Sequence, residues 1–89
     1  YYIRGLIYRA DGEYQKAIAD FDRAIKENDL PEYYNARAMT RFALGDGEKA
    51  VEDFSQAINK KPDFARAYYN RAYTYKKFPG SGGGTFGYI

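Results

Sequence analysis

The chain has neither cysteine nor histidine among its 89 residues. Without these side chains it cannot build a metal site from thiolate or imidazole, activate a nucleophile with a histidine base, or carry out thiol redox chemistry. We therefore expect no catalytic residue, no bound metal and no cofactor. Carboxylates are the remaining candidates for acid–base chemistry.

The chain also lacks an excess of either charge, because the formal net charge is +2 and acidic and basic residues are interspersed. Carboxylates lie among lysines and arginines on predicted helices, which is typical of a solvated face and not of a catalytic pair: Glu13, Asp20, Asp22, Glu48, Glu52 and Asp53. No basic stripe for nucleic acid and no apolar run near the roughly 20 residues of a membrane span is present. We expect no enzyme, no nucleic-acid partner and no membrane insertion, and the compartment stays open.

One pattern of small and aromatic residues occurs twice. Ala17-x-x-x-Phe21-x-x-Ala24 recurs as Ala50-x-x-x-Phe54-x-x-Ala57, displaced by 33 residues (17 to 50, 21 to 54, 24 to 57). A period in this range predicts stacked helical hairpins, because one hairpin cannot bury its own apolar face and must pack on a copy of itself.

A second pattern repeats in the same phase. Arg37-Ala38 recurs as Arg71-Ala72 after 34 residues (37 to 71), and Arg4-Gly5 occupies the same columns one repeat earlier. Together with the twice-written pattern, these columns resemble the tetratricopeptide repeat family over about residues 1–78. The resemblance implies an all-α, right-handed superhelix of antiparallel helical hairpins, with about five helices, that binds other proteins.

Helix boundaries follow from the apolar spacing and from the proline, glycine and aspartate positions. Pro31 suits the first turn of the third helix, Asp46 can cap the fourth, and Pro62 opens the fifth. Gly47 replaces the aromatic residue found at Tyr14 in the preceding repeat. The expected helices span 1–10, 13–27, 31–43, 47–60 and 62–77.

The last residues differ in composition from the repeats. We expect the repeat domain to end at residue 78, residues 79–84 to form a flexible Gly/Ser-rich linker, and the chain to be a segment of a longer protein. The segment after the linker is short and apolar: Thr85, Phe86, Gly87, Tyr88 and Ile89. We hypothesise that it is a peptide ligand fused to its own receptor by an engineered tether. A cloning remnant or a frayed natural tail is the alternative.

The first helix of each repeat lines the concave face in the family that the chain resembles. Residues one helical turn apart on those helices are therefore the predicted peptide-binding set: Tyr2, Leu6, Arg9, Asn35, Met39, Phe42, Arg66, Tyr69, Tyr73 and Lys76. Leu6, Met39 and Tyr73 share a column where family members commonly carry asparagine, so we expect a short apolar or aromatic ligand. Alternatively, these three residues pack against one another or against a neighbouring repeat.

The arginine column Arg4, Arg37 and Arg71 is predicted to pair with aspartates on the second helices, and we expect Arg37 to pair with Asp20. Such pairs fix helix packing more than they add stability.

The fifth helix is left with an apolar face near Tyr68, Ala72 and Tyr75. A solenoid end of this kind seeks a cover. The alternative function is therefore an assembly element, in which repeat ends or the tail pair between chains.

Overall fold

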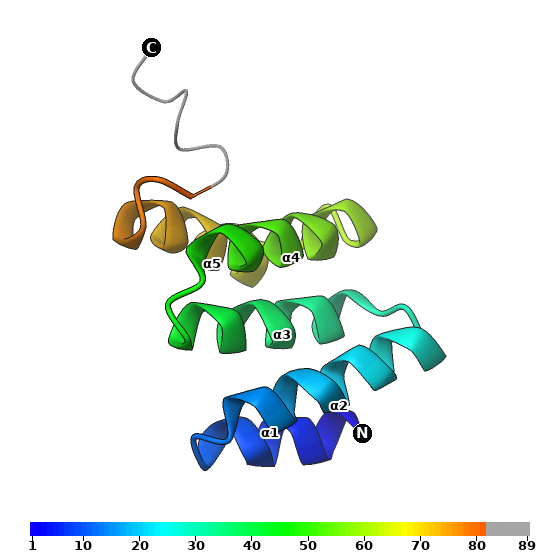
Figure 1. Ribbon diagram of the computed structural model, residues 1–89. Helices are drawn as coiled ribbons and strands as arrows, with labels where there is room; N and C mark the ends of the chain where they lie inside the picture. The colour runs from blue at the N-terminus through cyan, green and yellow to red at the C-terminus, as the bar shows by residue number, and fades with distance from the viewer. Residues whose placement is uncertain (82–89) are drawn as a thin grey trace.

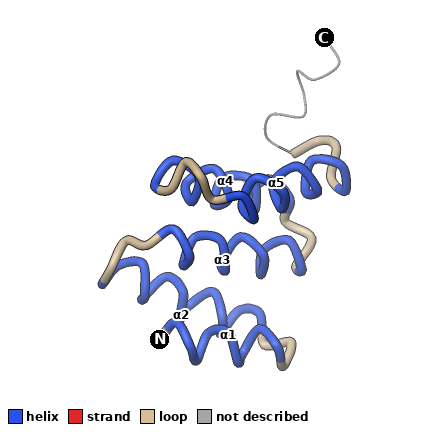
Figure 2. Tube along the Cα trace, turned by 180° about the vertical axis from the view of Figure 1, so that it is seen from behind, coloured by secondary structure: helices blue, strands red, loops and turns tan. Residues whose placement is uncertain are grey.

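The computed structural model describes residues 1–81, which form stacked helical hairpins. In both views α3 lies between the α1–α2 pair and the α4–α5 pair (Figures 1 and 2). The helices are α1 (Tyr2–Ala10), α2 (Tyr14–Glu27), α3 (Pro31–Ala43), α4 (Gly47–Lys60) and α5 (Ala65–Lys77). The predicted all-α hairpin architecture is confirmed. No helix within residues 1–81 combines the length and hydropathy that a membrane span needs.

The turns within the hairpins depend on glycine and an aspartate cap. Gly12 and Gly45 have φ values of 80° and 86°, a left-handed conformation that residues with a Cβ rarely adopt. The Asp46 carboxylate then accepts a hydrogen bond from the Lys49 amide at 3.2 Å, as the sequence predicted. The chain therefore reverses directly into α2 and α4.

The start of α5 differs from the expected one. α5 begins at Ala65 and not at Pro62, because Pro62 and Asp63 form a turn in which the Phe64 amide donates to the Lys61 carbonyl at 3.0 Å. Phe64 packs on the buried Ala57, Ile58 and Ala67. Phe64 is thus half-buried at the end of the turn, directly before the helix starts.

Each hairpin packs a phenylalanine of its second helix against a small residue of its first. Phe21 is 0% exposed and Phe54 is 1% exposed. A Cβ on Gly5 would lie 2.6 Å from Phe21, so α1 and α2 approach too closely for any side chain there. In the second repeat Ala38 fills this column and packs with Ala50 and Phe54. The small-residue columns of the sequence thus set the helix spacing.

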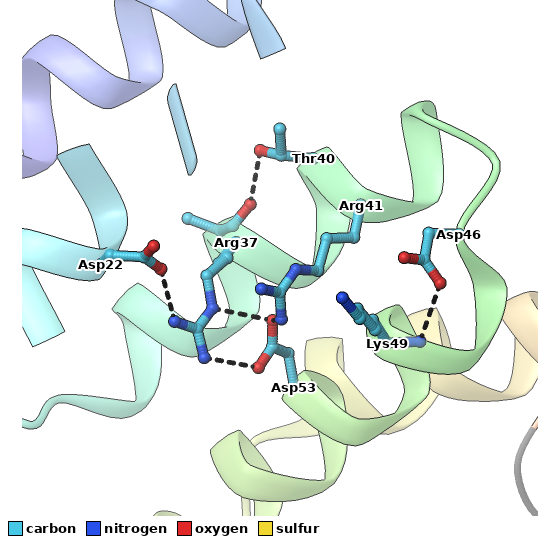
Figure 3. A network of polar contacts seen from close by, with 8 residues as sticks. Asp22, Arg37, Thr40, Arg41, Asp46, Lys49 and Asp53 are labelled. Carbon is cyan, nitrogen blue, oxygen red and sulfur yellow. Dashed lines mark hydrogen bonds and ion pairs between the residues drawn. The ribbon is translucent and has the colours of Figure 1, made fainter. Parts of the chain in front are cut away.

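Two arginines of the repeated column, Arg4 and Arg37, bind aspartates of the second helix in their own hairpins, and Figure 3 shows the network around Arg37. Arg37 donates to both carboxylate oxygens of Asp53, at 2.9 and 2.8 Å, and to Asp22 at 2.6 Å. The prediction that Arg37 pairs with Asp20 is wrong: Asp20 accepts two 2.8 Å hydrogen bonds from Arg4, which lower the pKa of its carboxyl group. Each aspartate accepts hydrogen bonds from the arginine 16 residues before it, because those two positions face each other across one hairpin.

A second arginine binds the same carboxylate. Arg41 Nη1 lies 2.7 Å from Asp53 Oδ2, and the Asp53 side chain is 4% exposed. Two guanidinium groups therefore compensate this buried charge.

The aromatic residue missing at Gly47 is replaced from another helix. A Cβ on Gly47 would lie 2.6 Å from the Phe78 Cβ, and the Phe78 ring stands edge-on to Phe42 with centroids 5.4 Å apart. The end of α5 therefore packs over the start of α4, in the space that a side chain at residue 47 would fill.

The expected linker and ligand segment are only partly described. Ser81 is the last described residue, so residues 82–84 of the linker and residues 85–89 of the hypothesised ligand lie outside the described part of the chain.

Candidate peptide-binding groove

A cavity of about 150 Å³ lies between α3 and α5, with a single residue of α4 as a third wall. Met39 and Tyr73 are 36% and 49% exposed, so the cavity opens to solvent between them. For comparison, a dry apolar cavity of this size in another protein binds benzene. The residues that line it are Met39, Phe42, Phe54, Asn70, Tyr73 and Thr74.

Aromatic contacts fix the cavity walls. Phe42 on α3 faces Tyr73 on α5, with ring centroids 5.6 Å apart and planes inclined by 34°. Phe78 also contacts the Phe42 ring, edge-on with centroids 5.4 Å apart. Phe54, 1% exposed, reaches the cavity from α4 as part of the core. These contacts pack the aromatic walls against one another without a ligand.

The polar groups around the cavity bond mainly to one another. Asn70 donates to Asn35 Oδ1 at 3.4 Å, which links α5 to α3. Asn35 and Arg9 both contact the Met39 sulfur, at 3.7 and 3.6 Å, and Arg9 thereby links α1 to α3. The cavity therefore offers a ligand mainly apolar and aromatic surface, with the Arg9 guanidinium at its α1 side. Residues 1–81 contain no cluster of three or more carboxylates that could hold a metal ion.

Three of the ten predicted peptide-binding residues line this cavity, and two more contact one of its lining residues. Met39, Phe42 and Tyr73 line it, and Asn35 and Arg9 contact Met39. This places side chains of all three first helices around one site.

Two predicted residues instead pack at the α1 end of the stack. Tyr2 and Leu6 are half-buried against the cluster of Ala17, Phe21 and Ala36. The Tyr2 ring lies 4.7 Å from the ring of Tyr33. Both residues keep an exposed part, but neither reaches the cavity.

The side of α5 that faces the cavity lies about one residue further along the helix than the predicted one. Arg66, Tyr69 and Lys76 are exposed, Tyr69 by 71%, and none of them lines the cavity. The helix is turned because Ala67 and Thr74 are its buried residues, so Asn70 lies beside Tyr73 on the inner side.

Sequence reasoning missed Phe54, Asn70 and Thr74 as lining residues. Thr74 had a detectable signal: it stands 34 positions after Thr40 (40 to 74), and both are 0% exposed with the hydroxyl bonded to the carbonyl four residues earlier. Thr40 and Thr74 therefore mark the packed side of α3 and α5. The repeat pattern identifies Phe54 as a core residue, and nothing in that pattern indicates that its ring also lines the cavity.

The arrangement agrees with comparisons to known proteins. Residues 1–29 match the family model described as tetratricopeptide repeat, and residues 39–77 match the one described as TPR repeat. The chain belongs to the tetratricopeptide repeat family. As such it is a protein–protein interaction module.

Several curated proteins are similar to this tetratricopeptide repeat chain. The small glutamine-rich tetratricopeptide repeat-containing protein of Dictyostelium discoideum is 36% identical over 65% of the chain and 18% of its own length. The photosystem I assembly protein Ycf3 of Rippkaea orientalis is 32% identical over 84% of the chain and 46% of its own length. The TPR repeat-containing thioredoxin TTL4 of Arabidopsis thaliana is 37% identical over 79% of the chain and 10% of its own length. The chain thus spans less than half of each of these relatives.

Proposed function

We propose that the groove between α3 and α5 binds a short extended peptide through an apolar or aromatic side chain, without catalysis and without a cofactor. The observation that carries the proposal is the solvent-connected cavity lined by Met39, Phe42 and Tyr73. One relative is named as a photosystem I assembly protein, which fits a role in holding other proteins.

The lining chemistry favours an apolar guest. Burial of one large apolar side chain contributes about 1.5–3 kcal/mol, and aromatic pairs add about 0.5–1.5 kcal/mol. Phe42 and Tyr73 offer such partners, and the unbranched Met39 side chain can adjust to guests of different shape. Selection by shape and exclusion of water is therefore the mechanism of recognition.

The chain's own last residues, 85–89, are the guest we propose. Phe78 packs on Phe42, a cavity residue, so the linker starts beside the site. Phe86 follows Ser81 by five positions and can lie up to about 17 Å from it. A linker this short gives an effective concentration of order mM, so binding with a Kd of about 1 mM occupies the groove about half of the time.

The test uses a variant that lacks Thr85–Ile89 and a free peptide of that sequence. We expect saturable binding with a Kd of about 1 mM or tighter, measured by NMR titration. No binding at millimolar peptide would contradict the tail hypothesis.

Two tyrosines of α5 give a matched pair of variants in the same background. Tyr73→Ala removes a cavity wall and should weaken binding about tenfold, whereas Tyr69→Ala removes a 71% exposed ring outside the cavity and should leave it within about twofold. Equal effects of the two substitutions would place the peptide elsewhere. Circular dichroism checks that both variants stay folded.

Assembly between chains is the second candidate, and exposed apolar residues on α1 favour it. Ile3 and Ile7 are 65% and 56% exposed and lie one helical turn apart. Light scattering over a dilution series separates the two candidates. A monomer at every concentration would remove assembly, and a mass that rises with concentration would support it.

A further inference from the structure

The three arginines of the repeated column make the same local contact with a tyrosine ring. Arg4, Arg37 and Arg71 each stand over the ring of the tyrosine three residues earlier, at 5.4, 5.5 and 5.7 Å from its centroid. Each guanidinium is therefore held in a similar position on its helix by a cation–π contact.

Their carboxylate partners differ. Arg4 and Arg37 bind aspartates 16 residues later on the neighbouring second helix, each through two hydrogen bonds. Arg71 bonds at 3.0 Å to the hydroxyl of Ser55, and no carboxylate of residues 1–81 lies within ion-pair distance of it. Arg71 is thus oriented for an acidic group that the described part of the chain does not supply.

The small-residue column shows the same asymmetry. Gly5 is buried and Ala38 is 0% exposed, because a second helix covers each of them. Ala72, in the same column of α5, is exposed, and Tyr68 beside it is 43% exposed. Tyr68, Arg71, Ala72 and Tyr75, here called the α5 outer face, are the counterpart of surfaces that α2 and α4 cover in the first two repeats.

We propose that the α5 outer face docks an amphipathic helix of another polypeptide that carries the pattern Ala-x-x-Asp-Phe-x-x-Ala. The pattern is taken from this chain, where Ala17-x-x-Asp20-Phe21 and Ala50-x-x-Asp53-Phe54 occupy the two covered surfaces. The partner aspartate binds Arg71, and the partner phenylalanine packs on Ala72. This surface is separate from the groove, so the two proposals can fail independently.

α4 is a better template for the partner helix than α2. α2 packs on a glycine at a distance where a Cβ would lie 2.6 Å from Phe21, whereas α4 packs on Ala38. Because α5 carries alanine in this column, a helix placed as α4 is on α3 fits without a clash. Within residues 1–81, a second copy of the chain has no free helix of this type, since its α2 and α4 are already packed in their own hairpins.

The test uses the full chain and a synthetic peptide with the sequence of residues 47–61. We expect binding with a Kd of order 0.1–1 mM, weakened by the cost of ordering a short helix. Arg71→Asp should weaken binding at least tenfold, and a peptide with aspartate 53 changed to arginine should bind the Arg71→Asp chain again. Lys77→Asp, a charge reversal two positions past Tyr75 on the other side of α5, should leave the affinity within about twofold.

Five results would overturn the proposal. Four come from the binding measurements: no binding at 1 mM peptide, an affinity that Arg71→Asp does not change, no recovery with the reversed peptide, and binding that appears only when residues 82–89 are deleted. The last result would assign the face to that segment. A peptide that shifts the Met39 methyl resonance occupies the groove instead and also counts against docking on α5.

Discussion

At the scale of single residues, two equivalent buried aspartates have arginine partners that differ in solvent exposure. Asp20 and Asp53 occupy the same column, yet the Arg4 side chain is 59% exposed while Arg37 and Arg41 are 17% and 20% exposed. Loss of the carboxylate lets Arg4 return to water, but leaves Arg37 and Arg41 partly buried without their main counter-charge.

We therefore expect Asp53→Asn to lower the free energy of unfolding by about 2–3 kcal/mol and Asp20→Asn to lower it by less. Urea unfolding followed by circular dichroism measures both. Equal losses would show that exposure of the arginine does not control the cost.

Acid should weaken the α1–α2 hairpin through Asp20. Hydrogen bonds from Arg4 hold the pKa of Asp20 below its ordinary value, against burial, which raises it. The folded pKa lies below the unfolded value of about 3.9, so this stabilisation is present above about pH 4. It is lost as the pH falls through the folded pKa. Unfolding free energies between pH 7 and pH 2 should therefore fall more steeply for the parent chain than for Asp20→Asn, and parallel curves would contradict this.

At the scale of helices, the sequence specified the elements well but not the rotation of the last one. Repeated small and aromatic columns predicted the hairpins, Pro31 and Asp46 marked helix starts, and apolar spacing marked the rest. The start of α5 and the residues it turns inward depend on burial of Phe64 and Thr74, which are tertiary contacts. Of the predicted site residues, three therefore line the cavity and two contact Met39 beside it, whereas Asn70 and Thr74 on α5 were missed.

The contact between α5 and α4 can be tested with a double-mutant cycle at Gly47 and Phe78. Gly47→Ala places a Cβ 2.6 Å from the Phe78 Cβ and should cost about 1–3 kcal/mol. In a Phe78→Ala background the ring is gone, although the Cβ contact remains, so the same change should cost at least about 1 kcal/mol less. Thermal unfolding of the four proteins gives the coupling, and additive effects would mean that the two residues do not touch.

The N-cap of α4 is a separate matter of helix stability. Asp46→Ala removes the only side-chain cap bond observed among the helices of residues 1–81. We expect a loss of about 1 kcal/mol in unfolding free energy, and Asp46→Ser should recover most of it. An unchanged stability in Asp46→Ala would show that water replaces the cap at no cost.

At the scale of the whole molecule, the stack offers two proposed binding surfaces, the groove and the α5 outer face. The groove between α3 and α5 is already walled by aromatic contacts, whereas the α5 outer face has an oriented arginine and exposed apolar residues. A small helical stack is only marginally stable, so covering either surface should raise the melting temperature. Peptide-dependent thermal shifts should therefore accompany both binding events.

The most direct test of the central claim is the methyl NMR signal of Met39, the single methionine of the chain, on the lip of the cavity. We expect the signal of a variant lacking Thr85–Ile89 to move on addition of that peptide, toward the position it has in the full chain. The shift should arise from the aromatic ring that enters beside Met39. A methyl signal that stays fixed while the peptide saturates would show that the groove between α3 and α5 is not the binding site.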